Sequence, residues 1–401
     1  MLLKDARLIL PHKIAEDASL LINGGRITRI WERGAMEDVR ADDTLELGGA
    51  TILPGFIDIH LHGAVGVDTM EAEAEDLHRV ARFLAQNGVT AWLPTLVPAP
   101  VEDYRRAARA IGTLMSEQDG HDTAAARALG LHYEGPFINS AQCGALRPAH
   151  FRTFTDASDI DALALPENAA ARRMITVAPE IGGGIELIKE LVARGWIVSL
   201  GHTRAGVHKL DDACAAGAHH MTHFMNAMSP LHHRAPGPIG WGLLKDEVSC
   251  DVIADGVHVD PLMLKLVLRA KTPARVALIS DAVAPAGLGD GEYNIWGETI
   301  SVIHGRTQNA RGSIAGSVIT MHDAVRTMLS LDIPIEDVAL MASSNPARLL
   351  GVNQDYGSIE EGKRADLVVL DDEGNVRLTL IGGRVAFENT GVIGEKYKSD
   401  R

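Results

Sequence analysis

The chain has 401 residues, of which 46% are apolar and 23% are charged, proportions close to those of an average globular protein. This composition excludes a disordered chain, a collagen and a coiled coil. Asp and Glu total 53 against 38 Lys and Arg, so the formal net charge is −15. Nucleic acids and anionic membranes are poor partners for such a chain, because clustered positive charge binds both. A small anionic substrate stays compatible, since it needs only a local positive pocket.

Cysteine content and apolar run length bear on the compartment. Cys143, Cys214 and Cys250 are too few for a disulfide framework, and none belongs to a CxxC pair, so we interpret them as inert thiols. The first ten residues do not have the long apolar run and cleavage site of a signal peptide. No stretch reaches the roughly 20 apolar residues that a membrane helix needs. These features predict a cytoplasmic protein.

Both ends of the chain contain short apolar stretches that Gly-Gly pairs interrupt. Strand-length stretches near the two ends cover residues 18–24, 25–31, 44–49, 362–371, 376–384 and 385–389. Because the two ends resemble each other and differ from the middle, we expect one small β-sandwich domain built from both. Its two parts are predicted at residues 1–52 and 351–401.

The middle of the chain alternates apolar runs with segments of helical periodicity. The runs cover residues 52–62, 89–96, 128–138, 174–180, 196–203, 219–228, 249–258 and 276–283. The helical spacing is clearest in two sets of residues: Leu77, Val80, Ala81 and Leu84, then Ile188, Leu191 and Val192. Eight strand runs that alternate with helices predict a (β/α)₈ barrel, an α/β fold, over residues 53–350. A hairpin insertion is expected at residues 293–303, before the last helix.

Imidazoles and carboxylates lie at the downstream ends of five of these runs. They are His60, His62, Glu134, His202, His223 and Asp281. A barrel brings the C-terminal ends of its strands to one face, where active sites lie. Side chains two residues apart in a strand point the same way, so His60 and His62 can reach one ion together. Imidazole and carboxylate are typical ligands of divalent transition metals, so the set predicts a metal site.

Asp281, at the end of the eighth run, fits more than one role. It could be a further metal ligand, or the general base that takes a proton from a metal-activated water. A helix N-cap is the ordinary structural alternative. The spacing alone leaves these roles open.

Several stretches match known motifs. Residues 54–62, Pro-Gly-Phe-Ile-Asp-Ile-His-Leu-His, and the tail at 357–371 resemble the amidohydrolase superfamily. More specific stretches are HYEGPFIN at 132–139, SLGHT at 199–203, MTHFMNAMSPLHHRAPG at 221–237, IADGVH at 253–258 and SDAVAPAG at 280–287. These resemble the N-acetylglucosamine-6-phosphate deacetylase family over essentially the whole chain. The resemblance implies metal-dependent hydrolysis of the acetamide of an N-acetyl amino sugar 6-phosphate.

The resemblance also implies roles for the polar residues at the strand ends. Glu134, His202 and His223 match the principal metal ligands of the family. His60 and His62 match the pair with which some members hold a second ion. The expected cofactor is therefore one or two divalent ions, zinc before iron, manganese or cobalt.

Further positions match the acid/base and the substrate contacts. Asp281 matches the family's acid/base, and the loop with His232, His233 and Arg234 is expected to bind the phosphate. In the family's dimers this loop reaches the neighbouring subunit's site, so a homodimer is expected. The positions implied as substrate contacts are Ala145, Asn226, Ala227, Arg234, Asp255, His258, Ile314 and Ala315.

One position departs from the family. After the Glu-Gly-Pro-Phe motif the family usually has Gly-Ala-His or Gly-Thr-His, whereas this chain has Gly144, Ala145 and then Leu146. Leucine cannot donate the hydrogen bond that the histidine provides. We expect Leu146 to face the sugar pocket, with Arg147 or a water in the role of the missing histidine.

This departure keeps a different amide open, such as N-acetylgalactosamine 6-phosphate, another N-acyl amino sugar or an N-acyl amino acid. A non-catalytic sugar-phosphate-binding protein is disfavoured, because every expected ligand and Asp281 are present. A nucleic-acid-binding protein is disfavoured by the charge and by an aromatic content of 4%, which is too sparse for base stacking.

Overall fold

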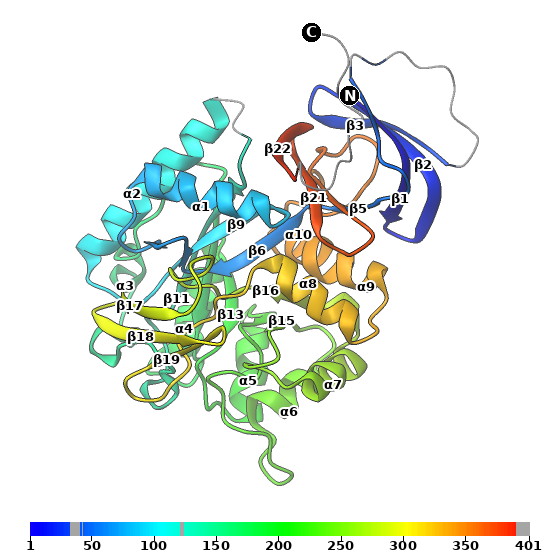
Figure 1. Ribbon diagram of the computed structural model, residues 1–401. Coiled ribbons are helices and arrows are strands. Elements are labelled where there is room, and N and C mark those ends of the chain that lie inside the picture. The colour runs from blue at the N-terminus through cyan, green and yellow to red at the C-terminus, as the bar shows by residue number, and fades with distance from the viewer. Residues whose placement is uncertain (33–40, 42, 121–123, 390–401) are drawn as a thin grey trace.

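The structure is a computed structural model that describes residues 1–32, 41, 43–120 and 124–389. Its strands form two large sheets. In Figure 1 the first strands, in blue, and the last strands, in orange and red, lie together at one end of the molecule beside a larger barrel. Among the described residues, no helix has the length and apolar character needed to cross a membrane.

The sheet at this end of the molecule contains strands from both ends of the chain. They are β1 Leu2–Leu10, β2 Lys13–Asn23, β3 Arg26–Trp31, β4 Thr44–Glu46, β5 Thr51–Pro54, β20 Leu367–Leu370, β21 Val376–Ile381 and β22 Arg384–Glu388. Antiparallel pairing of β5 with β20 joins the two halves into one eight-stranded sheet. The expected β unit built from both ends is thus confirmed, and apolar side chains such as Leu20, Ile52 and Leu367 form its core.

The domain boundaries stay predictions. Parts of the predicted ranges 1–52 and 351–401, at 33–40, 42 and 390–401, lie outside the described residues.

The predicted barrel is confirmed. Its eight parallel strands are β6 Phe56–Leu61, β9 Val89–Leu96, β11 Gly130–Glu134, β12 Arg172–Val177, β13 Ile197–Leu200, β14 His220–Met221, β15 Ser249–Ile253 and β16 Val276–Ile279. Seven of them lie within the predicted apolar runs, whereas β12 starts at Arg172, before the run at 174–180. The short β10, Arg127–Ala128, adds to the edge of β9. A parallel bridge between Leu61 and Ala282 closes the barrel, because the chain beyond β16 pairs with the end of β6.

Helices follow the strands and cover the barrel. They are α1 Ala74–Gln86, α2 Val101–Gly120, α3 Ser158–Asp161, α4 Gly184–Ala193, α5 Val207–Ala215, α6 Gly237–Leu244, α7 Pro261–Lys271 and α8 Met321–Ser330. In α1 the residues predicted from helical spacing, Leu77, Val80, Ala81 and Leu84, are those that face the core. After α8 come α9 Ile335–Ala339, a π-helix at Leu340–Ser344 and α10 Asn345–Leu349. Short 3₁₀ turns occupy Ser140–Gln142, Pro148–His150 and Pro273–Arg275.

The predicted hairpin insertion between β16 and α8 is present and longer than expected. Strands β17 Gly291–Ile295 and β18 Glu298–Ile303 form the hairpin, and β19 Arg306–Asn309 adds a third antiparallel strand. A smaller hairpin, β7 Gly63–Ala64 with β8 Val67–Asp68, follows β6. Both insertions begin at the C-terminal ends of barrel strands, so they lie around the face where active sites form.

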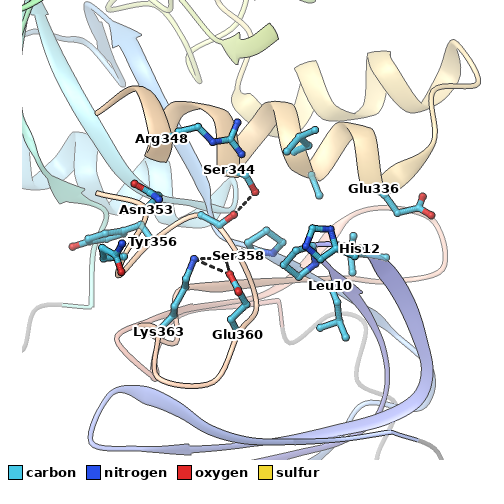
Figure 2. A pocket seen from close by; sticks show the side chains of 17 residues that line it. Leu10, His12, Glu336, Ser344, Arg348, Asn353, Tyr356, Ser358, Glu360 and Lys363 are labelled. Atoms are coloured by element: carbon cyan, nitrogen blue, oxygen red, sulfur yellow. Dashed lines mark hydrogen bonds and ion pairs between the residues drawn. The ribbon is translucent and has the colours of Figure 1, made fainter. Parts of the chain in front are cut away.

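A polar cavity of about 420 Å³ lies where the sheet meets the barrel, near the start of β6 (Figure 2). Three of the charged side chains in its lining are bonded to neighbours. Lys363 Nζ lies 2.8 Å from Glu360 and donates to the Ser358 hydroxyl, and Arg348 donates to Asn345 at 3.1 Å. Pro54, before β6, lines this cavity, so it is at the opposite end of the strand from the residues predicted to bind metal.

Candidate active site

The barrel brings the six polar residues predicted at the strand ends to one rim. His60 lies near the end of β6 and Glu134 is the last residue of β11, whereas the other four follow their strands by one or two residues. All six are at least 94% buried. They fall into two groups of three, whose donor atoms lie within 4.8 Å of one another: Glu134, His202 and His223, and His60, His62 and Asp281.

Glu134 occupies the centre of the first group. Its Oε1 lies 2.8 Å from His202 Nε2 and 2.9 Å from His223 Nε2. The two imidazole nitrogens are 3.1 Å apart. Two rings and one carboxylate oxygen therefore point at one small volume.

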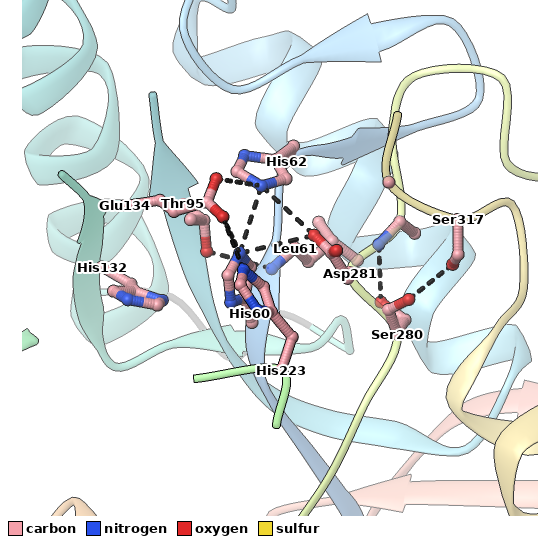
Figure 3. A network of polar contacts seen from close by, with 12 residues as sticks. His60, Leu61, His62, Thr95, His132, Glu134, His223, Ser280, Asp281 and Ser317 are labelled. Carbon is pink, nitrogen blue, oxygen red and sulfur yellow. Dashed lines mark hydrogen bonds and ion pairs between the residues drawn. The ribbon is translucent and has the colours of Figure 1, made fainter. Parts of the chain in front are cut away.

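The second group lies beside the first. His60 Nε2 and His62 Nε2 are 3.2 Å apart, and each is within 3.4 Å of Asp281 Oδ1. The other oxygen of Glu134, Oε2, lies 3.2 Å from His62 Nε2, so this carboxylate contacts both groups. Figure 3 shows the rings of His60, His62 and His223 directed toward the carboxylates of Glu134 and Asp281.

These residues fit a divalent cation. Two nitrogens that each bind one ion at about 2.0–2.1 Å must lie close to each other. The paired Nε2 atoms, which are 3.1 Å and 3.2 Å apart, have roughly the separation that this requires. The Nδ1–H of His202 donates to the Gln142 carbonyl at 2.7 Å, which leaves its Nε2 free to bind an ion. Imidazole and carboxylate are also the donor types that suit zinc and its neighbours in the transition series.

The electrostatics of the rim point the same way. Burial opposes a charge on His62, yet the carboxylates of Asp281 and Glu134 raise its pKa to about 10. Against burial, Glu134 likewise raises the pKa of His223 to about 9. Burial would raise the pKa of Glu134, but the facing histidines hold it well below its usual range. Negative charge is therefore concentrated at the rim, and a cation would neutralise it.

The backbone at the strand ends is strained. His202, His223 and Asp281 have φ values of 47°, 30° and 48°, in the left-handed region that non-glycine residues rarely occupy. Such conformations cost on the order of 1–3 kcal/mol each and persist only where surrounding contacts hold them. The strain turns these side chains from the barrel wall into the rim.

Two fully buried carboxylates beneath the rim supply such contacts. Asp251 accepts a short hydrogen bond from the backbone N–H of His223. Asp58 accepts the backbone N–H groups of His60 and Ser280 at 3.3 Å, and the Ser280 hydroxyl at 2.5 Å. These two aspartates were not singled out from the sequence, since each lies inside an apolar run and resembles any strand residue.

A cavity of about 320 Å³ opens beside the rim. The rim residues that line it are His62, Glu134, His202, His223 and Asp281. Its other lining residues come from the surrounding loops: Gly144, Ala145, Leu146, Asn226, Ala227, His258, Trp296, Ser313, Ile314 and Gly316. Five of the residues predicted as substrate contacts thus line this cavity: Ala145, Asn226, Ala227, His258 and Ile314. Leu146 faces the same cavity.

Other predicted contacts lie outside this lining. Asp255 stands behind His258, whose Nδ1 donates to its Oδ2 at 2.6 Å. Ala315 is buried in the insertion, beside Ile314. Arg234 is exposed on the loop after β14, where its guanidinium lies 2.8 Å from His233 Nε2. His232 and His233 are exposed on the same loop.

Arg147, the expected substitute for the missing histidine, is exposed and also lies outside the lining. It precedes the 3₁₀ turn at Pro148–His150, and its guanidinium approaches Gly297 in the insertion. Its position leaves Leu146, and not Arg147, facing the cavity.

Trp296 is a lining residue that sequence reasoning missed. It lies in the turn of the predicted hairpin, and its ring meets the ring of His62 edge to face, with centroids 5.3 Å apart. A bulky aromatic residue next to Gly297 in a hairpin turn was a possible signal, because asparagine, aspartate or glycine usually occupies that position.

Comparison with known proteins identifies the family. The model of the amidohydrolase family matches residues 51–386. N-acetylglucosamine-6-phosphate deacetylase of Bacillus subtilis is 34% identical over 396 residues, covering 96% of this chain and 97% of that protein. N-acetylgalactosamine-6-phosphate deacetylase of Escherichia coli O157:H7 is 34% identical over 386 residues, covering 96% and 98%.

A solved structure shows the same arrangement. The crystal structure of N-acetylglucosamine-6-phosphate deacetylase from Thermotoga maritima superposes with a TM-score of 0.86 at 31% sequence identity. It covers 97% of this chain and 100% of that chain. The likeness extends over the barrel and the sheet together. The chain therefore belongs to the amidohydrolase family, and its relatives there include the N-acetylglucosamine-6-phosphate deacetylases.

Proposed function

We propose that the chain hydrolyses the acetamide of N-acetyl-D-glucosamine 6-phosphate to glucosamine 6-phosphate and acetate, a step of amino sugar catabolism. The observation that supports this most directly is the rim itself. Glu134 contacts histidines of both groups at the wall of one cavity. Asp281, in the second group, adds another carboxylate beside them. The Bacillus subtilis and Thermotoga maritima relatives carry this activity in their names.

The residues that would hold the metal are assigned from this geometry and from the resemblance. Glu134, His202 and His223 form the principal site, and His60 with His62 form the second. A bound divalent cation would supply the Lewis acidity that polarises the amide carbonyl and makes water nucleophilic at neutral pH. Zinc is the proposed ion because imidazole nitrogens dominate the donor set.

Two ions are proposed because Glu134 presents one oxygen to each group. Its Oε1 faces His202 and His223, while its Oε2 faces His62. Elemental analysis of protein titrated with zinc should approach two equivalents per chain. Saturation at one equivalent, unchanged when His60 and His62 are both replaced by alanine, would contradict the second site.

Asp281 is assigned the proton transfers. Its carboxylate lies within 3.4 Å of the histidines at the rim and lines the cavity, so it can accept a proton from the attacking water. The same carboxyl group can then deliver that proton to the amine as the C–N bond breaks. One residue therefore serves as base and then as acid.

His258 and Asn226 are assigned to the polar end of the substrate. Both line the cavity, and Asp255 fixes the His258 ring through its Nδ1–H. Because Nδ1 is bonded to Asp255, Nε2 is the ring nitrogen left to bind a polar group of the substrate.

Arg234 is assigned to the phosphate of a neighbouring subunit's substrate. It is exposed and lies outside its own subunit's cavity, and its planar guanidinium suits a phosphate. A homodimer is proposed with it, because a loop that serves a neighbouring subunit's site needs that subunit beside it. Leu231 on this loop, Leu244 at the end of α6 and Leu262 at the start of α7 are 48%, 81% and 75% exposed and are the apolar residues proposed for the contact.

Mixing two defective variants tests this assignment. An Asp281→Asn chain keeps Arg234, and an Arg234→Ala chain keeps Asp281. If Arg234 acts across the interface, each mixed dimer regains one intact site, and activity at low substrate should rise to about a quarter of wild type. A mixture no more active than the mean of its components would place Arg234 in its own subunit's site.

The function itself is tested by a deacetylation assay with a panel of sugars. The substrates are N-acetylglucosamine 6-phosphate, its galacto epimer and both unphosphorylated sugars. We expect acetate release to be fastest from the phosphorylated gluco sugar. Absence of acetate release from all four, in protein loaded with zinc, would contradict the proposal.

N-acetylgalactosamine 6-phosphate is the second candidate substrate. The Escherichia coli enzyme named for it is as similar to this chain as the Bacillus subtilis enzyme is, at 34% identity. The replacement of the family histidine by Leu146 adds to this possibility, since it changes the cavity wall. The same assay separates the epimers.

A cytoplasmic location stays a prediction.

A further inference from the structure

The cavity has one apolar wall among polar ones. His62, Glu134 and Asp281 make its metal side polar, and Asn226 with His258 make a second side polar. His202 and His223 add to the polar side at the rim, and the other large side chains in the lining are apolar: Leu146, Trp296 and Ile314. Trp296 packs against the apolar cluster that contains Leu146, so the wall is continuous with the core of the barrel.

Trp296 reaches this wall at a cost to the backbone. Strands β17 and β18 pair up to Ile295 and Glu298, so Trp296 and Gly297 form a two-residue hairpin turn. Their φ values, 51° and 73°, are both positive, as a type I′ turn requires. Asparagine, aspartate or glycine is favoured at the first of these positions, and a bulky aromatic residue there is an outlier.

Contacts hold the indole in place. Its ring meets the ring of His62 edge to face. Its buried Nε1 has no hydrogen bond of ordinary geometry in the described structure, but it faces Asp68. A strained residue that neighbours a rim histidine points to a role in function.

The proposed substrate has one apolar group to match this wall. An N-acetyl amino sugar phosphate carries hydroxyls and a phosphate, and the methyl of its acetyl group is its apolar end. Hydrolysis requires the amide carbonyl at the rim. Trp296 lines the same cavity as the rim residues and contacts His62, so it is placed to meet the group attached to that carbonyl. Burying a methyl there is favourable, whereas burying a hydroxyl without a partner is costly.

We infer that Trp296 is a specificity-determining residue, which with Leu146 and Ile314 forms an acyl-binding wall that selects apolar N-acyl groups over hydroxylated ones. This inference rests on the proposed function, since it places the acyl group of that substrate. It assigns the strained turn of the insertion to recognition of the acyl group.

The test compares N-acetyl with N-glycolyl glucosamine 6-phosphate, which differ by one hydroxyl on the acyl group. For the wild-type protein loaded with zinc, kcat/KM should favour the acetyl substrate by roughly 10- to 100-fold. In Trp296→Asn the preference should fall to within about threefold, because the apolar face is lost. Trp296→Phe should keep most of the preference, because phenylalanine restores that face.

The asparagine variant separates recognition from folding. Asn-Gly is a favoured type I′ turn, so Trp296→Asn should unfold at the wild-type temperature or above it. A matched control lies in the next turn of the same insertion, where His304 and Gly305 have φ values of 52° and 72°. The His304 side chain is 95% exposed, so His304→Asn makes the same turn change away from the cavity and should leave the acyl preference unchanged.

The outcomes are distinct. Hydrolysis of the acetyl substrate with a preference that Trp296→Asn does not change would overturn the inference and leave the proposed function standing. Equal losses on both substrates would also overturn it, since they would indicate a structural role. If the wild-type protein releases acid from neither substrate, the proposed function fails and the inference fails with it.

Discussion

The rim of the barrel and the loop after β14 differ in how the chain holds them. The six rim residues are at most 6% exposed and stand at or near strand ends. Buried Asp58 and Asp251 accept the backbone N–H groups of His60 and His223. Residues 230–236, which include Arg234, are exposed throughout and bond largely to one another, as in the bridge between His232 and Ala235. A buried centre can be completed by one chain, whereas an exposed cationic loop is available to another.

With the proposed assignments, reaction chemistry lies on strand ends and substrate recognition lies on loops. Strand ends are rigid, so they suit groups that must meet within a few tenths of an ångström. Loops are variable, so they suit groups that choose a substrate. Variants on each support should therefore fail in different ways, and their effects should fall in size from the rim outward.

Loss of a principal ligand should have the largest effect. His202→Ala or His223→Ala removes one of the two imidazoles that face Glu134 Oε1, so bound metal and activity should be lost together. Elemental analysis and the deacetylation rate measure the two effects. His208→Ala, an exposed histidine on α5, is the control and should retain both. Full metal content in both rim variants would refute the ligand assignment.

Asp281→Asn should leave the metal largely in place and lower turnover. Asparagine keeps the shape of the side chain but cannot accept and return a proton, so kcat should fall by about 10²-fold or more. Metal content and kcat measured on one preparation check this. A kcat near that of the wild type would show that another group carries the proton.

Arg234→Ala should act on the phosphate alone. The loss of charge-assisted hydrogen bonds should cost about 1.5–3 kcal/mol, which corresponds to a rise in KM of roughly 10- to 150-fold for the phosphorylated sugar. The unphosphorylated sugar is the internal control and should be almost unaffected. Equal losses on both sugars would indicate a structural role and would remove the contrast between rim and loop.

The fold and the rim could be predicted from the sequence because their signals are local. Each barrel strand overlaps an apolar run, and each rim residue lies at the end of its strand or close to it, as Glu134 and Asp281 do. A closed parallel barrel then brings those ends together whatever the details of packing. The family motifs added the roles of these residues and the loop positions.

The rest depends on contacts between distant segments. Nothing in the sequence near Trp296 shows that its turn folds back onto His62, because that contact is set by how the insertion packs on the barrel. The support from Asp58 to Ser280 spans 222 residues and leaves no local pattern. The sequence likewise does not show that Arg234 is exposed and lies outside the cavity lining, because this depends on how its loop folds.

Leu146→His should have the smallest effect, and it tests the boundary between the two supports. Leu146 lines the cavity and is 4% exposed, so a histidine there would face the substrate, where the family's histidine is expected to act. It adds a hydrogen-bond donor. Activity on N-acetylglucosamine 6-phosphate should therefore stay unchanged or rise, as measured by kcat/KM, with the unfolding temperature as a check on the fold.

The variant Arg147→Ala is a companion test, because Arg147 is the residue expected to take the role of the family histidine. Arg147 is exposed and outside the cavity lining, so its removal should leave KM and kcat unchanged. A large loss in Leu146→His with the fold intact would mean that the cavity is shaped around leucine for another acylated substrate, and the epimer and acyl panels would then identify it. A large loss in Arg147→Ala would instead show that Arg147 replaces the family histidine. Recognition at this edge of the cavity would then depend on an exposed loop, as is proposed for the phosphate.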